Sequence, residues 1–375
     1  MNSTRPIAIA GAGIGGLTLG CMLARHGIPF RIFEKAPALA PVGAGIALAD
    51  NALRALAHAG LAEAVRAAGQ PLRQADICDS TARVIVGMRE LPFPVVVMAR
   101  TELQQALLAP IAGHVECNRG VAGYAHRDEG VVVRFDDGAE MEAALLIGAD
   151  GLRSRVRAAM HGDEPLRYSG QTSWRAIAEP AGLPDTGRMT ESWGPGLRFG
   201  IVPLTGGRVY WFAVAEEPSG GRDAGGVGAT LRAKFEGWHA PIDAVIASTD
   251  DARIVRTDIF DRPPIRAWAE GRAVLLGDAA HPMTPNLGMG GCQAIEDAVV
   301  LGNALARESG VEAALAHYQA RRVSRANRFV NRSFTFGRLA HARSRPVRWL
   351  RDRALGALSR GLALRALRRD LDFRL

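Results

Sequence analysis

A glycine-rich apolar segment near the N-terminus constrains the fold of this chain more than any other feature. Residues 6–24 contain five glycines and no charged side chain. A segment of this length and apolarity resembles a membrane span or a signal sequence. Five glycines would make a poor lipid-facing helix, however, and the segment divides into a strand over 7–10, a tight turn and a helix, followed by a second strand over 29–33. We therefore reject both membrane interpretations and predict a β-α-β unit.

The turn of this unit carries the pattern G-x-G-x-x-G, formed by Gly11, Gly13 and Gly16. Glycines between a strand and a helix allow a tight turn and let backbone N–H groups approach a pyrophosphate, next to the partial positive charge of the helix N-terminus. Glu34 follows the last glycine by 18 residues and can accept hydrogen bonds from ribose hydroxyls. The pattern predicts a dinucleotide site, for NAD or for FAD. The alternative is a glycine-rich turn without a ligand.

A second candidate site feature lies near residue 278. An apolar run over 273–276 ends in Gly277 and Asp278, and a carboxylate at the C-terminal end of a buried strand suits the hydroxyls of a sugar alcohol. The glycine-rich loop 285–291 then leads into a helix whose apolar residues recur at steps of three or four. We expect the N-terminus of that helix to lie where it could stabilise an anionic ring.

The pattern along the chain predicts an α/β fold in which a Rossmann-like domain is interrupted by a second domain. Apolar and aromatic runs over 172–178, 197–203 and 208–215 are separated by turns rich in glycine and proline, which predicts a separate, mainly antiparallel β-sheet. A hairpin over 131–147 leads into a buried strand of the first domain. We divide the chain into a discontinuous dinucleotide-binding domain, 1–70, 100–165 and 271–335, a substrate-binding sheet domain, 71–99 and 166–270, and an Arg-rich helical tail, 336–375.

Several enzyme classes lack their central residues in this chain. It contains no G-x-S-x-G serine, no H-E-x-x-H pair and no Walker loop, so hydrolase, metalloprotease and NTPase interpretations fail, and we expect no metal site. The four cysteines are too widely spaced for a zinc or redox pair, which favours the reduced cytoplasm. We interpret His281 as a structural residue of its turn. The glycines near residue 225 follow a polar loop, so we predict no second nucleotide-binding domain.

Three motifs together resemble the FAD-dependent aromatic hydroxylases, the single-component flavoprotein monooxygenases of the p-hydroxybenzoate hydroxylase type. They are Gly11-x-Gly13-x-x-Gly16, then Gly148-Ala-Asp150-Gly151-Leu-Arg153-Ser-x-Val156-Arg157, and Gly277-Asp278-Ala-Ala-His281-Pro282. The resemblance covers about residues 5–335 and implies non-covalent FAD, with NAD(P)H as a transient reductant and O2 as co-substrate. The FAD-binding residues that it implies are Gly11, Gly13, Ile14, Gly15, Gly16, Glu34, Lys35, Gly45, Arg100, Val121, Asp150, Asp278, Pro285, Gly288, Met289, Gly290 and Gly291.

Within this family the segment Gly288-x-Gly290-Gly291-Cys292-x-Ala294-x-Glu296-Asp297 is most similar to the branch of urate hydroxylase, salicylate hydroxylase and zeaxanthin epoxidase. That branch implies that Pro285, Gly288 and Gly290 flank the flavin, and we assign no side chain as catalytic acid or base. Arg198, Tyr210, Phe212 and Trp174 are the candidate substrate residues. The alternatives are that Arg198 is a surface residue of its strand and that the aromatic residues belong to the core.

The resemblance predicts a monooxygenase that hydroxylates or epoxidises an aromatic or conjugated small molecule through a flavin C4a-hydroperoxide. NADH or NADPH as the reductant, and a monomer or a homodimer as the assembly, stay open. The rival hypotheses are a flavin-dependent oxidase, a halogenase on the same fold and a non-catalytic binding protein that kept the flavin fold. A halogenase would need a catalytic lysine and a W-x-W-x-I-P segment, which Trp174-Arg-Ala-Ile177 does not match. Intact Glu34, Asp150 and Asp278 argue against a non-catalytic protein.

The C-terminal region carries the basic excess of the chain. From residue 321 onward there are 16 arginines and three acids, against a formal net charge of +8 for the whole chain. Three interpretations of this region stay open: a solvated helix face, which we favour, an amphipathic helix at an anionic membrane surface, and a nucleic-acid patch, which we rank last. Only two of the 46 basic residues are lysines, so the arginines here reflect a preference of the whole chain.

Overall fold

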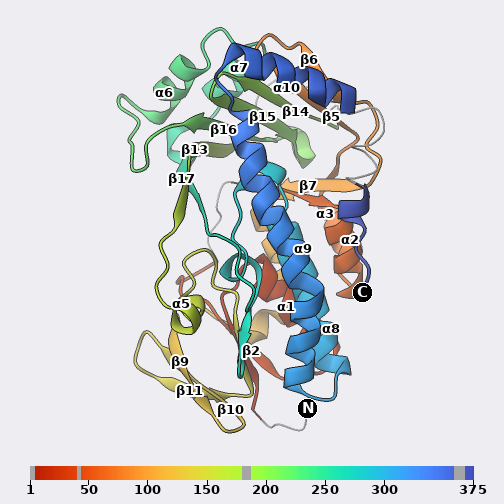
Figure 1. Cartoon of the computed structure of the whole chain (residues 1–375), viewed down its shortest axis with the longest axis vertical. Helices are drawn as coiled ribbons and strands as arrows, with labels where there is room; N and C mark the ends of the chain where they lie inside the picture. The colour runs from red at the N-terminus through yellow and green to blue at the C-terminus, as the bar shows by residue number, and fades with distance from the viewer. Residues whose placement is uncertain (1–4, 40–43, 180–186, 359–367) are drawn as a thin grey trace.

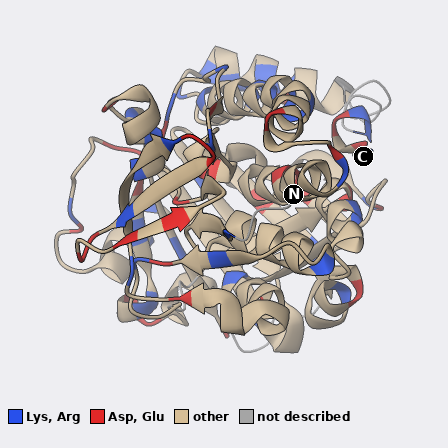
Figure 2. Ribbon diagram, turned by 90° about the horizontal axis from the view of Figure 1, so that it is seen from below, with Lys and Arg blue, Asp and Glu red and all other residues tan. Residues whose placement is uncertain are grey.

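The structure is a computed structural model that describes residues 5–39, 44–179, 187–358 and 368–375. It consists of two main layers of strands, one toward each end of the long axis, and a long helix that runs past both (Figure 1). Basic and acidic residues are interspersed in the view from below (Figure 2). Within the described ranges, no helix has both the length and the apolarity that crossing a bilayer requires.

The first layer is a six-stranded sheet with the strand order β18-β19-β12-β1-β2-β8. Its strands are β1 (Ile7–Ala10), β2 (Phe30–Phe33), β8 (Val115–Glu116), β12 (Leu145–Gly148), β18 (Ala269–Glu270) and β19 (Ala273–Leu275). All neighbours pair in parallel except β18 and β19. The predicted β-α-β unit is therefore confirmed, and the chain returns to this sheet at β19 after a long insertion.

Helices and two small sheets complete this part of the fold. The helices are α1 (Ile14–Arg25), α2 (Asp50–His58), α3 (Ala62–Ala68), α4 (Arg100–Leu108), α5 (Arg155–His161), α8 (Gly290–Arg307) and the 3-10 turns η1 (Ala109–His114), η4 (Gly277–Ala279) and η5 (Pro285–Leu287). The hairpin predicted from residue 131 is found as β10 (Gly130–Phe135) and β11 (Glu140–Ala143), which form a sheet with β9 (Val121–Arg127). Strands β3 (Gly45–Ala49), β4 (Gln70–Pro71) and β7 (Val95–Ala99) form the other small sheet.

The second layer is a seven-stranded sheet with the order β17-β13-β16-β15-β14-β5-β6. Its strands are β5 (Gln74–Asp79), β6 (Val84–Met88), β13 (Arg167–Ala178), β14 (Arg188–Gly194), β15 (Leu197–Pro203), β16 (Val209–Glu216) and β17 (Val255–Asp261), and only β14 and β5 pair in parallel. Helices α6 (Val227–Lys234) and α7 (Ile242–Ala247) pack on one face, over a core that contains Phe199 and Trp211. The short turns η2 (Thr205–Gly207) and η3 (Asp251–Arg253) complete the insertion. The α/β fold with an inserted, mainly antiparallel sheet is thus confirmed.

The C-terminal region is integrated into the fold. Helix α9 (Val311–Ala340) lies along α8 and reaches the seven-stranded sheet, and α10 (Arg345–Leu358) then lies over that sheet beside β6 (Figure 1). Residues 368–375 lie back against the first domain, where Leu371 and Phe373 are buried. The boundary that we placed at residue 336 falls inside α9, and the other domain boundaries stay predictions.

Candidate active site

The turn between β1 and α1 is closely packed at Gly11 and Gly16 and accessible to a ligand at Gly13. Gly11 has φ +102°, and an added Cβ there would lie 2.5 Å from the Ala149 carbonyl oxygen. An added Cβ at Gly16 would lie 2.1 Å from the Gly11 carbonyl oxygen. At Gly13, which precedes α1, the same atom would meet no atom of the described ranges within 4 Å. A pyrophosphate could therefore approach the first N–H groups of α1, at Ile14 and Gly15, from the space beside Gly13.

Glu34, just after β2, is held against this turn. Its two carboxylate oxygens accept hydrogen bonds from the backbone N–H groups of Ala12, at 2.9 Å, and Ala36, at 3.0 Å. The turn, the end of β2, the start of β9 and the end of β12 enclose a cavity of about 200 Å³. The residues that line it include Gly11, Gly13, Glu34, Lys35, Val121 and Asp150. Six of the residues that were predicted to bind FAD thus share one cavity.

Asp150, which follows β12, uses only one of its two carboxylate oxygens for hydrogen bonds within the part of the chain that the structure describes. Its Oδ2 accepts hydrogen bonds from the backbone N–H groups of Arg155, at 2.7 Å, and Val156, at 3.2 Å. Its Oδ1 is buried and has no hydrogen-bond partner among the described residues. Burying an unsatisfied acceptor costs free energy, and a ligand in the cavity could supply the missing donor. The open backbone at Gly13 and this acceptor fit the ADP half of a dinucleotide.

The motif that contains Asp150 is joined to the Gly277-Asp278 turn by one buried arginine. Arg157 is 2% exposed and donates hydrogen bonds to the carbonyl oxygens of Ala279, at 3.3 Å, and Ala280, at 3.0 Å. It also donates to Glu164, at 2.8 Å. Two motifs more than 100 residues apart in the sequence therefore form one unit.

Asp278, in η4, lies beside the start of α8. An added Cβ at Gly290 would lie 3.8 Å from Asp278 Oδ1. The side chain is exposed to solvent on one side, but the surrounding protein atoms partly desolvate the carboxylate and raise the pKa of Asp278, while the charges of His281 and Arg100 act to lower it. Arg100 is the first residue of α4, and its backbone N–H donates to the Ala44 carbonyl oxygen at 2.8 Å. Asp278 and Arg100 are thus close enough to interact electrostatically.

The loop 285–291 follows Asp278 in the sequence and has an accessible backbone at Gly288. Pro285 and Gly288 are exposed, Gly288 has φ +63°, and an added Cβ at Gly288 would meet nothing within 4 Å. Met289 precedes α8 and is buried, so it anchors the loop. At Gly291 an added Cβ would lie 2.7 Å from Ile46 Cδ1, which brings β3 close to the start of α8. The open position in this loop is thus Gly288, two residues before the N-terminus of α8 and its partial positive charge.

Behind this loop lies a buried charged cluster that the sequence motifs did not predict. The ring nitrogen Nε2 of His281 lies 2.5 Å from Asp297 Oδ2, which also accepts a hydrogen bond from the Gly277 N–H at 3.0 Å. Arg322 of α9 donates to Asp297 Oδ1 at 2.7 Å and to Glu296. Burial would raise the pKa of Asp297, but His281 and Arg322 outweigh it and lower the pKa to about 2. The cluster fixes the Gly277-Asp278 turn to α8 and α9, in agreement with a structural role for His281.

Tyr210 and Phe212 lie on the face of the seven-stranded sheet that is turned toward β3 and β7. They pack there around Val97 of β7 and Val202 of β15. An added Cβ at Gly45 would lie 2.4 Å from Tyr210 Cγ, so the ring lies directly against the Gly45 backbone. Two of the predicted substrate residues thus share one face, as side-chain alternation requires, and this face adjoins a predicted FAD residue.

Arg198 of β15 lies on the same face, but its guanidinium forms hydrogen bonds with other residues of the protein. It is 2% exposed, and its guanidinium donates to Glu191 Oε1 at 3.1 Å and to Asn286 Oδ1 in the loop 285–291. Burial lowers the pKa of Arg198, and Glu191 opposes that shift. Arg198 therefore links the seven-stranded sheet to the loop that precedes α8.

Trp174 of β13 lies on the opposite face of the sheet. It is 0% exposed, its Nε1 donates to Asp223 Oδ2 at 2.9 Å, and it belongs to the core with Phe199 and Trp211. The prediction that Trp174 contacts the substrate is therefore wrong. Its neighbour Arg175 pairs in register with Phe212 and presents the other face.

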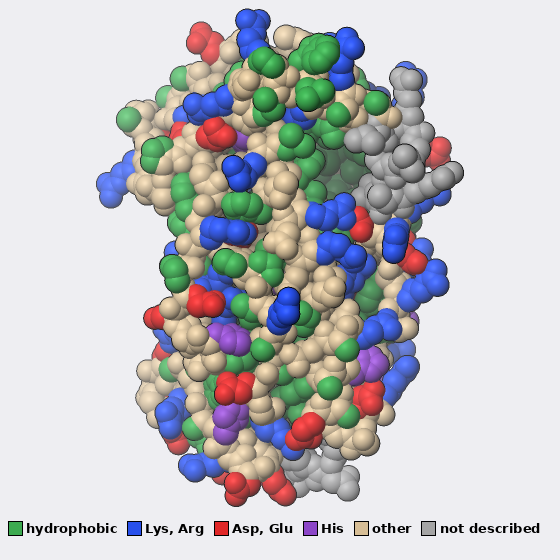
Figure 3. Space-filling model, viewed as in Figure 1, with side chains coloured by type: hydrophobic (Ala, Val, Ile, Leu, Met, Phe, Trp, Pro, Cys, Tyr) green, Lys and Arg blue, Asp and Glu red, His purple; other side chains and the backbone are tan. Residues whose placement is uncertain are grey.

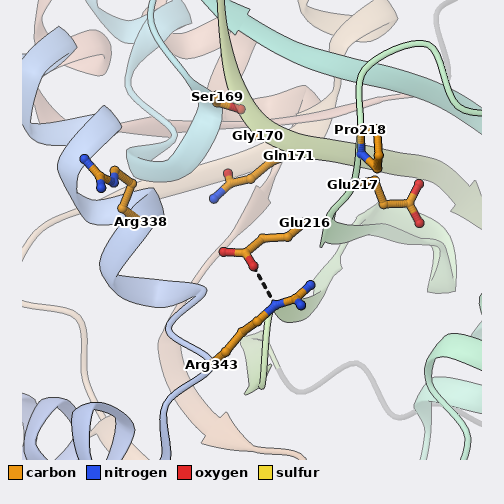
Figure 4. A pocket seen from close by; sticks show the side chains of 8 residues that line it. All are labelled: Ser169, Gly170, Gln171, Glu216, Glu217, Pro218, Arg338 and Arg343. Carbon is orange, nitrogen blue, oxygen red and sulfur yellow. Dashed lines mark ion pairs between the residues drawn. The ribbon is translucent and has the colours of Figure 1, made fainter.

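A separate hollow of about 560 Å³ lies where β13 and β16 meet the end of α9. Its lining combines two acids with two arginines, and an ion pair of 2.7 Å joins Arg343 to Glu216 across it (Figure 4). None of the predicted site residues lines this hollow. It is therefore separate from the cavity that adjoins Gly13 and Asp150.

Comparison with known proteins decides the family. The profile of a family described as FAD binding domain matches residues 4–333. This chain belongs to that family. HpxO of Klebsiella pneumoniae, solved in complex with FAD and uric acid, superposes with a TM-score of 0.90 at 28% identity, over 98% of this chain and 96% of HpxO. The FAD-dependent urate hydroxylase of Klebsiella pneumoniae is 34% identical over 84% of this chain and 85% of its own length.

A further relative matches the whole chain. The aurachin C monooxygenase/isomerase of Stigmatella aurantiaca is 46% identical over 100% of this chain and 99% of its own length. The predicted resemblance to the FAD-dependent aromatic hydroxylases is thus confirmed. The FAD binding domain, together with FAD in the matching structures, also confirms FAD as the cofactor.

Proposed function

We propose that this FAD-dependent monooxygenase consumes NAD(P)H and O2 and hydroxylates or epoxidises an aromatic or conjugated ring compound. The observation that carries the proposal is the match of 46% over the full length to a monooxygenase that acts on aurachin C. We therefore propose aurachin C, or a compound of its class, as the first substrate to test. Bound FAD would supply the redox chemistry, accepting a hydride and activating O2 to transfer one oxygen atom.

The chain's own residues would bind and orient the cofactor. The α1 N-terminus at Gly13 and the carboxylates of Glu34 and Asp150 would hold the ADP half, because they line one cavity. Asp278 and Arg100 would hold the part nearest the ring. Pro285, Gly288 and Gly290 would flank the flavin, where the first turn of α8 could stabilise negative charge on the reduced ring without a cationic side chain.

The sheet face that carries Tyr210 and Phe212 would orient the substrate and exclude water. Tyr210 lies against Gly45, next to the start of β3, so a ring compound between this face and the loop 285–291 would be close to the flavin-flanking residues. Burial raises the pKa of Tyr210, which keeps its phenol protonated and able to donate a hydrogen bond at neutral pH. A dry site favours oxygen transfer to the substrate over release of H2O2.

The experiment that tests the proposal is stopped-flow reduction of the FAD-loaded protein by NADH and by NADPH, alone and with candidate ring compounds. The panel contains aurachin C, uric acid and 3-amino-4-hydroxybenzoate, together with simple phenols. We expect slow reduction without a ring compound and faster reduction with a member of the aurachin class. A rate that no ring compound changes, but that an aliphatic amine raises, would support an oxidase instead.

A further inference from the structure

Exposed apolar side chains are concentrated at one end of the molecule. Among the described residues, six large hydrophobic side chains are strongly exposed, and three of them are Val347, Trp349 and Leu350 of α10. Trp349 is 58% and Leu350 64% exposed. Val84 of β6, a strand that contacts α10, and Leu339, near the end of α9, are two of the others. Such a grouping marks an interaction surface, whereas single exposed hydrophobic residues do not.

The opposite side of α10 is fixed to the protein. Arg351 is 4% exposed, donates to the Ala340 carbonyl oxygen at 2.8 Å, and lies 4.8 Å from the Trp193 ring. Asp352 is paired with Arg351 at 2.8 Å and with Arg83. The exposed apolar side chains therefore belong to a helix whose other face is anchored, and they project from a defined surface.

The exposed face of α10 combines these apolar residues with positive charge. Arg345 and Arg353 are exposed, and Arg353 lies 4.4 Å from the Trp349 ring. The only acid of α10, Asp352, is part of the anchored side. Hydrophobic and basic side chains lie next to one another at this end of the molecule (Figure 3). A helix with tryptophan and leucine on its exposed face and arginines beside them is typical of helices that lie in a membrane interface.

We propose that α10 docks this enzyme on an anionic lipid surface, with Val347, Trp349 and Leu350 inserted at the headgroup level and Arg345 and Arg353 facing the phosphates. A second copy of the chain fits this face poorly, because a two-fold contact would place these arginines against one another. Nucleic acid fits poorly as well, since its phosphates would leave the apolar residues uncovered. The proposal does not depend on the identity of the substrate.

The test is flotation of the FAD-loaded protein with vesicles. One set contains phosphatidylcholine and phosphatidylglycerol, and the other contains phosphatidylcholine alone. We expect binding to the anionic set, weaker binding to the neutral set, and a decrease as salt is added, because the arginine contribution is screened. Brominated acyl chains should quench fluorescence in the wild type, and Trp349→Phe should remove most of that quenching.

A matched pair of leucines isolates the helix face. Leu350→Ser should weaken binding to anionic vesicles about tenfold, the loss expected for one leucine that is no longer buried in the interface. Leu375→Ser removes a leucine that is 41% exposed at the chain end, outside α10, and should bind as the wild type does. Arg345→Gln with Arg353→Gln should abolish the preference for anionic lipid. FAD content and unfolding midpoints confirm that each variant is folded.

Three results would overturn the proposal. The first is the absence of binding to either set of vesicles. The second is equal loss in Leu350→Ser and Leu375→Ser, since the α10 face would then play no special part. The third is a concentration-dependent dimer that Leu350→Ser abolishes while lipid binding is absent, which would identify a second copy as the occupant.

Discussion

Replacing Gly13 by alanine should separate cofactor binding from folding. The added methyl group would meet no atom of the described residues within 4 Å, and φ is −74°, which alanine adopts freely. The unfolding free energy of the FAD-free protein should therefore stay within about 0.5 kcal/mol of the wild type. The methyl group would occupy the space where a pyrophosphate approaches α1. Losing one hydrogen bond to a charged phosphate costs roughly 1.5–3 kcal/mol, so the FAD dissociation constant should rise roughly 10- to 150-fold.

Gly16→Ala is the matched control for this substitution. Its Cβ would lie 2.1 Å from the Gly11 carbonyl oxygen, so the turn must shift and the protein should lose about 1–3 kcal/mol of stability even without FAD. The assay combines titration of FAD, followed by its fluorescence, with urea unfolding of the FAD-free protein. If Gly13→Ala binds FAD as tightly as the wild type, or loses as much stability as Gly16→Ala, the assignment of this turn is refuted.

Three further predictions concern single side chains. Glu34→Ala should weaken FAD binding by roughly 1–3 kcal/mol in the same titration, because the ribose hydroxyls of FAD would lose their acceptor. An unchanged affinity would place the ribose elsewhere. Burial, followed by the positive charge of Arg198, lowers the pKa of His341 from 6.5 to about 3, so the unfolded state binds more protons below pH 6.5. As the pH is lowered from 6.5 to 3, the unfolding free energy should decrease by up to about 1.4 kcal/mol per pH unit. Urea unfolding of His341→Asn should show a weaker dependence on pH over this range. An equal dependence in the two proteins would contradict the lowered pKa of His341. Arg198→Gln should lower the unfolding free energy by about 2–4 kcal/mol, because it removes the charge that is paired with Glu191 and the hydrogen-bond donor to Asn286, and it should raise H2O2 formed per NAD(P)H. The control is Arg188→Gln, at a side chain that is 46% exposed, which should change the unfolding free energy by less than about 0.5 kcal/mol. Equal effects of the two substitutions would refute the stabilising link between Arg198 and the loop 285–291.

Local patterns predicted the parts of the fold that depend on neighbouring residues. The strand at 7–10, the turn with Gly11 and Gly13, and the hairpin from residue 131 each rest on short-range periodicity and turn chemistry. The discontinuous first domain could also be predicted, because the run before Gly277 has the apolar character of a strand buried on both faces. These predictions needed no knowledge of contacts between distant segments.

The parts that could not be predicted depend on long-range packing. Alternation shows that Tyr210 and Phe212 share a face, but it cannot show which residues of another strand share that face with them. The sequence therefore grouped Trp174 with these two residues. In the structure Trp174 lies on the other face of the sheet, which α6 and α7 cover. Two adjacent acids in the apolar segment at Glu296 and Asp297 were the only signal for the buried cluster, because its arginine comes from another helix.

The C-terminal region shows the same limit. Its arginine content suggested a solvated helix, and composition alone could not separate arginines that are buried from those that are exposed. The structure places Arg351 at 4% exposure and leaves Trp349 and Leu350 outside. Which side of an Arg-rich helix contacts the protein is set by its partner strand and not by the helix itself.

The most direct test of the central claim is the origin of the oxygen atom in the product. The FAD-loaded protein would be incubated with NAD(P)H, a ring compound that accelerates flavin reduction, and isotopically labelled O2, and the product would be examined by mass spectrometry. We predict one labelled oxygen atom per product molecule and one NAD(P)H consumed for each. A product whose new oxygen comes from water, or NAD(P)H consumption that yields only H2O2 with every ring compound, would contradict the assignment of this protein as a monooxygenase.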